Sequence, residues 1–148
     1  MKLLSFPSPL GILCAVEENE MLVALLFGGE GTEETPLLQE TRRQLDAYFR
    51  GHLQQFDLPL NARGSDFRRR VWQRMAAIPY GQVLSYGALA AELGSPGAAR
   101  AVGTACHHNP LPIVLPCHRV VGSKGALVGY AGGVDKKSFL LRLEQGAR

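Results

Sequence analysis

Three short apolar segments open the chain, over residues 3–6, 12–16 and 21–27. Turn-forming residues separate them, with Pro9, Leu10 and Gly11 in the first gap and the polar run 17–20 in the second. Short apolar runs bounded by such residues are typical of strands joined by tight turns. We therefore expect a small antiparallel sheet in this part of the chain.

A helix is expected directly after this sheet. Thr35 suits its N-cap, Pro36 its first helical position and Gly51 its C-terminal stop. Between these residues one helix face is apolar, and it consists of Leu38, Leu45, Tyr48 and Phe49. Residues 52–65 are rich in turn formers and predict a linker. We place a domain boundary near residue 62, which gives an N-terminal domain over 1–61 and a C-terminal domain over 62–148.

The second half of the chain predicts mostly helices. Ser65 suits the N-cap of a helix that ends at the Pro-Tyr-Gly segment 79–81. The apolar stripe of this helix consists of Phe67, Val71, Met75 and Ile78. Ser85 suits the N-cap of the next helix, in which Leu89 and Leu93 point inward and Gly94 is the stop.

Ser95 and Pro96 are expected to open a further helix at once, running to about Cys106. Two short helices joined by a tight turn at Gly94 and Ser95 predict a helix-turn-helix. The apolar segment 138–145 predicts a last helix packed on the core. The predicted fold class is therefore α+β, with a small antiparallel sheet and its helix followed by a mainly helical domain.

Composition is that of a globular protein with a real core, since 46% of the 148 residues are hydrophobic and 20% are charged. A net charge of +3 permits a polyanionic partner without requiring one. We find no apolar run near the roughly 18 residues of a membrane span and no signal peptide. The three cysteines form no disulfide or metal pattern, which favours a reducing compartment, and we expect the cytoplasm.

Candidate chemistry lies at Cys117 and His118, which are adjacent in sequence between Pro116 and an apolar run. The thiolate is the reactive form of cysteine, and a neighbouring base or cation is the usual way to obtain it at neutral pH. Adjacent side chains diverge in a strand or turn, so we expect a bridging water rather than a direct hydrogen bond. The pair alone suits several classes of enzyme.

The second helix of the expected helix-turn-helix offers a single base-reading side chain, Arg100, among alanines and glycines. A helix that reads the major groove needs several Asn, Gln, Arg or Lys side chains. Two interpretations are open: a tightly packed buried helix, or a helix whose small face lies very close to DNA. The run Arg68-Arg69-Arg70 is likewise open between a solvated helix face and a contact with phosphates.

The segment Asn109-Pro110-Leu111-Pro112-Ile113-Val114-Leu115-Pro116-Cys117-His118-Arg119-Val120 resembles the active-site signature of the O6-alkylguanine-DNA alkyltransferases, also called methylated-DNA–protein-cysteine methyltransferases. The resemblance is specific over residues 65 to 145 and weak before them. It implies a ribonuclease H-like N-terminal domain and a winged helix-turn-helix-like motif in the C-terminal domain. It also implies direct reversal of DNA damage.

The resemblance assigns roles to five catalytic candidates. Cys117 is the alkyl acceptor, and a relay runs from Glu144 through His118 and a water to Cys117. Tyr86 helps to rotate the nucleotide and hydrogen-bonds guanine at N3, while Asn109 ties the active-site loop together. Without the resemblance, Glu144 reads as a surface residue and Tyr86 as a core aromatic.

The resemblance also assigns a DNA-binding surface and a substrate pocket. Arg100 is the finger that fills the gap left by the flipped nucleotide, and Arg119 is a structural ion-pairing residue. The remaining DNA-binding candidates are Ala98, Ala99, Ala101, Gly103 and Ser123. The pocket candidates are Val120, Tyr130, Ala131 and Gly132, and residue 131 is expected to contact O6 through its backbone N–H.

The implied reaction is one irreversible transfer of an alkyl group from O6-alkylguanine, mainly O6-methylguanine, to Cys117, without turnover; O4-methylthymine is left open as a second substrate. The expected partner is double-stranded DNA carrying the lesion, bound by a monomer with cooperative binding left open. We expect no cofactor and no metal, because Cys14 and His52 lack partners in sequence. His107 and His108 are open between metal ligands and solvated residues.

Three rival functions share some of these features. A cysteine hydrolase would use the same residue types, but the papain and caspase signatures are absent and such enzymes place the histidine far from the cysteine in sequence. An alkyltransferase-like damage sensor shares the fold but lacks the reactive cysteine. A helix-turn-helix regulator would need a recognition helix with more base-reading side chains.

Overall fold

The computed structural model describes residues 1–128, 130 and 132–146 and divides into two compact units, Met1–Arg63 and Gly64–Arg148. No helix within the described residues is long and apolar enough to cross a membrane.

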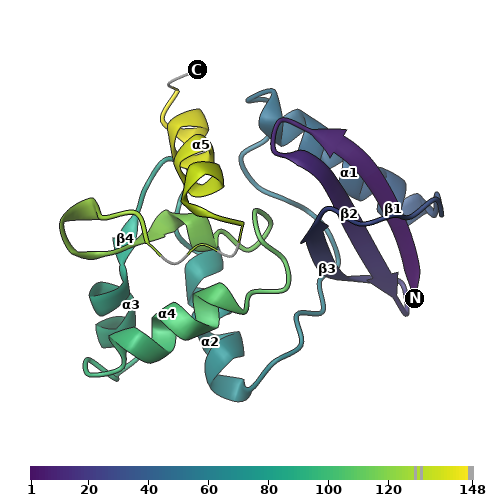
Figure 1. Cartoon of the computed structure of the whole chain (residues 1–148). Coiled ribbons are helices and arrows are strands. Elements are labelled where there is room, and N and C mark those ends of the chain that lie inside the picture. The colour runs from purple at the N-terminus through teal and green to yellow at the C-terminus, as the bar shows by residue number, and fades with distance from the viewer. Residues whose placement is uncertain (129, 131, 147–148) are drawn as a thin grey trace. The chain divides into compact units, whose positions relative to one another are not determined.

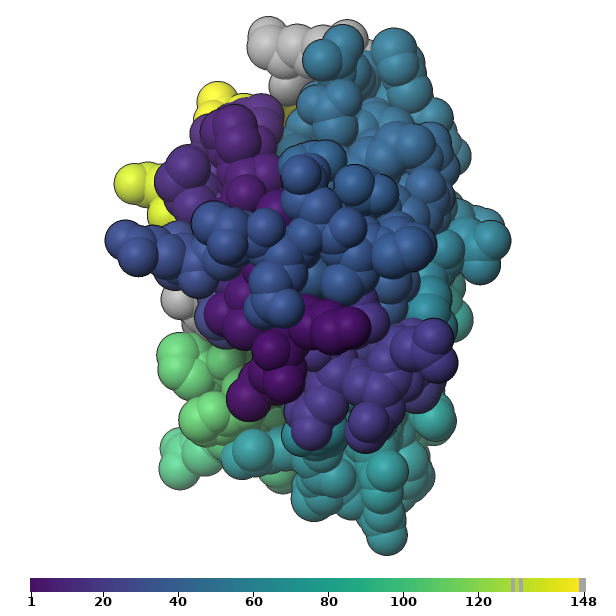
Figure 2. Space-filling model, turned by 90° about the vertical axis from the view of Figure 1, so that its right-hand side faces the viewer, coloured from purple at the N-terminus to yellow at the C-terminus, as the bar shows by residue number. Residues whose placement is uncertain are grey.

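The first unit is a three-stranded antiparallel sheet with one helix (Figure 1). Its strands β1 (Lys2–Ser8), β2 (Gly11–Glu18) and β3 (Met21–Phe27) are neighbours in chain order. Helix α1 (Pro36–Phe49) packs against all three strands and buries Leu38, Leu45 and Tyr48 completely. The side chains of the strands and of the segments around α1 form one continuous surface, purple to blue in Figure 2.

The predicted ends of α1 are confirmed. The Thr35 hydroxyl accepts a hydrogen bond from the Leu38 backbone N–H, and Pro36 occupies the first helical turn. Gly51 follows the helix with a φ of 78°, a conformation that costs glycine little and other residues more. Local capping chemistry therefore sets both ends of this helix.

The second unit is mainly helical. Its helices are α2 (Asp66–Ala76), α3 (Tyr86–Glu92), α4 (Ala99–His107) and α5 (Val134–Glu144), with short 3₁₀ turns η1 (Cys117–Arg119) and η2 (Ser123–Gly125). Strands β4 (Leu84–Ser85) and β5 (Val120–Val121) pair in parallel, with Leu84 opposite Val120. This pairing fixes the start of α3 beside the residues that follow Cys117.

Helices α3 and α4 form the expected helix-turn-helix, and α2 packs against both. The Trp72 indole N–H of α2 donates to the Ala105 carbonyl of α4 at 2.8 Å. One guanidinium of the arginine run, that of Arg70, donates to the Leu93 carbonyl at the end of α3, and Arg69 pairs with Asp66. Two of these three arginines therefore make contacts within the second unit.

Three predicted helix boundaries were wrong. Helix α2 ends at Ala76, two residues before Ile78, and α5 begins at Val134, four residues before the predicted start. Ser95 and Pro96 do not open α4; they lie in the turn, where the Ala98 backbone N–H donates to the Ser95 carbonyl. Turn chemistry at Ser95 therefore replaces the helix cap that the sequence suggested.

Candidate active site

Cys117 lies at the first position of η1, and the segment before it is held by Asn109. The Asn109 side chain donates to the Leu115 carbonyl at 2.8 Å and accepts from the Leu111 backbone N–H at 2.9 Å. The Cys117 backbone N–H donates to the Leu115 carbonyl at 2.8 Å. These bonds close the approach into a compact loop that presents a buried thiol, only 2% exposed.

Burial of Cys117 raises the pKa of its thiol to about 11. A hydrogen bond from Asn109 and the charge of Lys137 act in the opposite direction and lower that pKa. The reactivity of this thiol therefore depends on the polar groups that the fold places around it.

His118 is the next residue of η1, and its side chain is completely buried against Glu144. Its Nε2 atom lies 2.6 Å from Oε2 of Glu144. Because a carboxylate only accepts, Nε2 carries the proton of a neutral imidazole and Nδ1 carries the lone pair. Within the described residues Nδ1 has no hydrogen-bond partner. Burial lowers the pKa of His118, against the opposing effect of Glu144.

Glu144 ends α5, and it is buried rather than exposed as its sequence context alone suggested. Arg119 donates to it twice, from Nε to Oε1 at 2.8 Å and from Nη2 to Oε2 at 3.0 Å. The Gly81 backbone N–H adds a longer contact of 3.4 Å to Oε1. Arg119 also donates to the Ile78 carbonyl at 2.7 Å and lies over the Tyr80 ring. This network fixes the carboxylate that faces His118.

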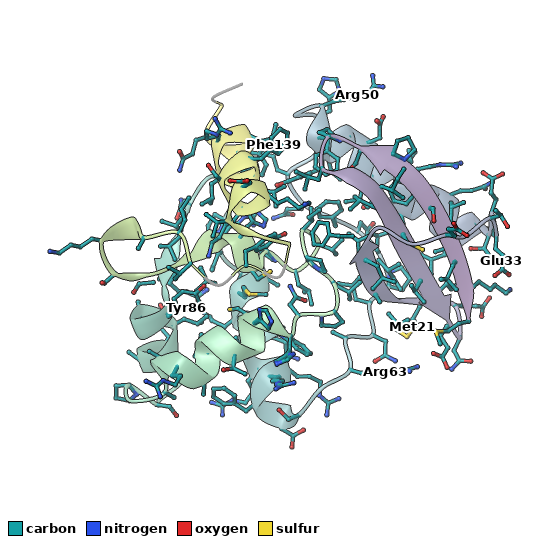
Figure 3. All side chains as sticks on the ribbon, viewed as in Figure 1. Met21, Glu33, Arg50, Arg63, Tyr86 and Phe139 are labelled. Atoms are coloured by element: carbon teal, nitrogen blue, oxygen red, sulfur yellow. The ribbon has the colours of Figure 1, made fainter. Side chains whose placement is uncertain are left out.

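Tyr86 is the first residue of α3 and is labelled in Figure 3. Its hydroxyl donates to the Val128 carbonyl at 2.9 Å and receives a hydrogen bond of 3.3 Å from Lys137. Burial, followed by the charges of Cys106 and Cys117, raises the pKa of Tyr86, so its hydroxyl keeps its proton at neutral pH. The structure therefore places this phenol in the same cluster as the thiol.

Lys137 is a member of this cluster that the sequence analysis missed. It is completely buried on α5 and donates to the carbonyls of Val120 at 2.6 Å and Val128 at 2.8 Å. A signal was present in the sequence, because Lys137 precedes Leu140, Leu141 and Glu144 by three, four and seven residues. These spacings place it on the inward face of a helix.

The DNA-binding candidates lie on or next to α4 and on η2. Arg100 and Ala101 are exposed in the first turn of α4, while Ala98 and Ala99 are half-buried at its start. A methyl group at Gly103 would lie 3.9 Å from the Tyr86 ring, an ordinary contact distance. Ser123 is exposed on η2, in the same unit as Cys117.

The pocket candidates fall in two groups. Val120 and Tyr130 are buried, at 0% and 6% exposure, and Gly132 is half-buried. Burial raises the pKa of Tyr130, and the charges of Cys117 and Glu144 act in the same direction. Ala131, which was predicted to contact O6, lies outside the described residues.

Metal ligation finds no support in the part of the chain that the structure describes. No three His, Cys, Asp or Glu residues there are grouped so that they could hold an ion. His107 and His108 are exposed at the end of α4, and their rings meet edge to face with centroids 5.2 Å apart.

Comparison with known proteins identifies both units. Residues 1–62 match the family model described as 6-O-methylguanine DNA methyltransferase, ribonuclease-like domain, and residues 66–146 match the DNA binding domain of the same family. A methylated-DNA–protein-cysteine methyltransferase from Mycolicibacterium paratuberculosis is 46% identical over 146 residues, which cover 93% of this chain and 88% of the relative. The constitutive enzyme of that name from Bacillus subtilis is 44% identical over 151 residues, covering 93% and 92%.

A solved structure agrees over nearly the whole chain. The crystal structure of Mycobacterium tuberculosis OGT in complex with DNA superposes with a TM-score of 0.92 at 41% identity, covering 99% of this chain and 94% of the other. The predicted fold class, with its sheet-bearing first domain and helical DNA-binding second domain, is confirmed. The chain therefore belongs to the 6-O-methylguanine DNA methyltransferase family.

Proposed function

We propose that this protein repairs alkylated DNA by direct reversal, taking the alkyl group of O6-alkylguanine irreversibly onto its own Cys117. The observation that carries the proposal is the buried line from Glu144 through His118 to the segment that holds the Cys117 thiol. It lies in the unit that matches the family's DNA binding domain. O6-methylguanine is the main substrate, and O4-methylthymine is a second substrate to be tested.

The first step is loss of the thiol proton. Neutral His118 has its Nδ1 lone pair available, and a water bridging to Cys117 would pass the proton to it. Glu144 accepts from Nε2 and stabilises the imidazolium that forms, in the way that a third group orients a catalytic base. Arg119 and the Gly81 N–H hold that carboxylate in place.

The second step is an in-line displacement. A bond forms between the Cys117 sulfur and the alkyl carbon while the bond from that carbon to O6 breaks. The electron pair of the broken bond stays on guanine, which takes up one proton. Tyr86 is the proposed donor at N3, for which its hydroxyl must leave the Val128 carbonyl. The product is a thioether, which does not hydrolyse, so each molecule acts once.

The target base must leave the duplex before it can reach a buried sulfur. Extrusion of a base costs a few kcal/mol, which an inserted side chain offsets in part. Arg100, exposed in the first turn of α4, is the proposed inserted residue, and the small side chains at 98, 99, 101 and 103 let the helix approach closely. Ser123 is a further proposed contact, and Val120, Tyr130 and Gly132 are the proposed pocket walls.

We further propose that the boundary near residue 62 separates a supporting N-terminal domain from the domain that carries this chemistry. The protein is proposed to act as a monomer in the cytoplasm, where it would meet chromosomal DNA. Cooperative binding along DNA is an additional question for the same binding experiments.

The deciding experiment is intact-mass analysis after incubation with duplex DNA that contains one O6-methylguanine. The expected result is a gain of one methyl group per protein, located on the peptide that holds Cys117. Cys117→Ser should bind the DNA without gaining mass, and Cys14→Ser, a matched change in the other unit, should react like the unaltered protein. Binding without methylation of reduced Cys117 would contradict repair and favour a damage sensor.

A further inference from the structure

The hydrogen bonds of Lys137 reveal its charge state. Its Nζ atom has three partners: the Val120 carbonyl at 2.6 Å, the Val128 carbonyl at 2.8 Å and the Tyr86 hydroxyl oxygen at 3.3 Å. The carbonyls can only accept, and the Tyr86 hydroxyl already uses its hydrogen on Val128. Three donated bonds match the three N–H groups of the ammonium form. Burial lowers the pKa of Lys137, and the charges of Cys117 and Cys106 act in the opposite direction.

This ammonium has no anionic partner of the ordinary kind. None of the ion pairs formed among the described residues includes Lys137, whereas the other buried cation, Arg119, is paired with Glu144. His118 is neutral in the arrangement described above. An unpaired charge that is fully removed from water is costly, so an anion is expected close by.

The groups that surround the ammonium narrow the choice of anion. The Tyr86 hydroxyl of α3 accepts from this ammonium, and the ammonium charge interacts with the thiols of Cys106 on α4 and Cys117 on η1 and with the imidazole of His118. Glu144 already serves Arg119 and His118. Of the two thiols, Cys106 lies against the Met75 sulfur at 3.9 Å, whereas Cys117 is three residues before the Val120 carbonyl to which Lys137 donates. Cys117 is therefore the group best placed to supply the anion.

We propose that Lys137 is a positioning residue whose buried ammonium is the counter-charge of the Cys117 thiolate. Neutral His118 carries the thiol proton away, and Lys137 stabilises the negative sulfur that remains. The inference rests on the proposed function for its biological meaning, but the charge pairing itself exists without DNA. Because the two groups interact, they titrate as a pair rather than as independent sites.

The geometry of α5 supports separate roles for its two buried charges, with Lys137 acting on the thiolate of Cys117 and Glu144 acting on His118. Lys137 and Glu144 are seven residues apart, two turns along one buried face. The helix therefore brings a cation to the thiol side of the cluster and an anion to the imidazole side. The Val120 carbonyl, which accepts from Lys137, belongs to the strand that directly follows η1, so the ammonium is anchored three residues from the reactive sulfur.

The test is the rate at which iodoacetamide alkylates Cys117 between pH 7 and 9, followed by peptide mass spectrometry without DNA. Lys137→Gln, which keeps hydrogen-bond donors but removes the charge, should slow the reaction at least about tenfold, since one pKa unit changes the thiolate fraction tenfold. Lys137→Arg should retain the rate to within about threefold, because it keeps the charge. Lys136→Gln, on the same helix, should react like the unaltered protein.

The alkylation rate distinguishes loss of the Lys137 charge from a loosening of the site. A site that was merely loosened would admit the reagent more easily, so Lys137→Gln would react faster; that result, or an unchanged rate, would overturn the proposal. Failure of methyl transfer from DNA with this pattern intact would count against the proposed function alone.

A second measurement does not depend on whether Lys137→Gln folds. In protein labelled with ¹⁵N-lysine, the Nζ signal of Lys137 should titrate at lower pH in Cys117→Ser than in the unaltered protein, because the anionic partner is gone. Titration at the same pH in both proteins would contradict the pairing.

Discussion

The Nε2 atom of His118 lies 2.6 Å from Oε2 of Glu144, and neither side chain is exposed to solvent. The two residues come from segments that are 26 positions apart, η1 and the end of α5. Their contact fixes the tautomer of the imidazole and leaves Nδ1 as the basic atom. A terminal helix thus determines which nitrogen of His118 can act as a base.

Glu144→Gln is expected to slow methyl transfer from DNA at least about 100-fold, within the range that general base catalysis contributes. The amide cannot stabilise an imidazolium, and it leaves Arg119 without its anion, so unfolding should become easier by about 3 to 5 kcal/mol. Single-turnover rates and urea unfolding measure the two effects. Glu92→Gln, which breaks a surface pair with Arg74, should cost about 1 kcal/mol or less and leave the rate unchanged.

Tyr86→Phe is expected to reduce the rate of transfer from duplex DNA by about 10- to 100-fold, because the ring remains but the proton donor for guanine N3 is lost. Stability should fall by only about 1 kcal/mol, since Lys137 still donates to the Val128 carbonyl. The comparison that checks the role is the reaction with iodoacetamide, which has no guanine leaving group and should be little affected. Equal losses with both substrates would count against the donor assignment.

Arg100→Ala should slow repair of duplex DNA while leaving the reaction with a free O6-alkylated guanine base unchanged. The free base needs no extrusion, so the contrast isolates the step at which the arginine acts. Arg142→Ala, an exposed change on α5, is the matched control. An unaltered duplex rate in Arg100→Ala would refute the finger assignment.

Gly103→Ala should have opposite effects on the stability of the protein and on its contact with DNA. A methyl group there would make an ordinary 3.9 Å contact with the Tyr86 ring, and alanine favours a helix by about 1 kcal/mol, so stability should be kept or rise. Repair of duplex DNA should fall if α4 approaches the DNA closely at this position. Thermal unfolding and duplex repair rates, measured on the same preparation, test both halves; unimpaired repair would place Gly103 outside the interface.

The pH dependence of stability follows from His118. Burial holds its pKa below the ordinary value of 6.5, so the unfolded chain binds more protons as pH falls below that value. The second unit should therefore lose stability below about pH 6.5, by up to about 1.4 kcal/mol per pH unit from this residue. Fluorescence of Trp72, the chain's single tryptophan, reports unfolding of that unit.

The control pair for this titration is His118→Asn and His52→Asn. The first should flatten the slope between pH 7 and 5, and the second, an exposed histidine in the other unit, should leave it intact. A slope that survives His118→Asn would assign the acid sensitivity to other groups.

Patterns within a few residues of each other made most of the fold predictable. The serine and threonine caps at Thr35, Ser65 and Ser85 mark helix starts that the structure confirms. The turn at Ser95 was misjudged because serine followed by proline satisfies the chemistry of a cap and of a turn equally well. Nothing in the local sequence distinguishes the two.

Local sequence patterns predicted only part of the candidate site. The adjacent pair Cys117 and His118 was visible in the sequence and the resemblance supplied Glu144, and the structure shows that His118 and Glu144 meet. Lys137 was missed because a lysine normally lies at the surface, and its burial depends on carbonyls of β5 and of the segment before residue 129, both distant in sequence. Only the folded chain brings such acceptors together.

Helix α5 carries both Lys137 and Glu144, so a single element supplies the two charges on which the thiol and the imidazole depend. Local unfolding of that one helix would remove both charges at once, so that neither could act on Cys117 or His118. Amide hydrogen exchange in α5 and the reactivity of the sulfur should therefore respond together to temperature and denaturant. When α5 opens, the protein therefore also loses its ability to transfer an alkyl group to Cys117.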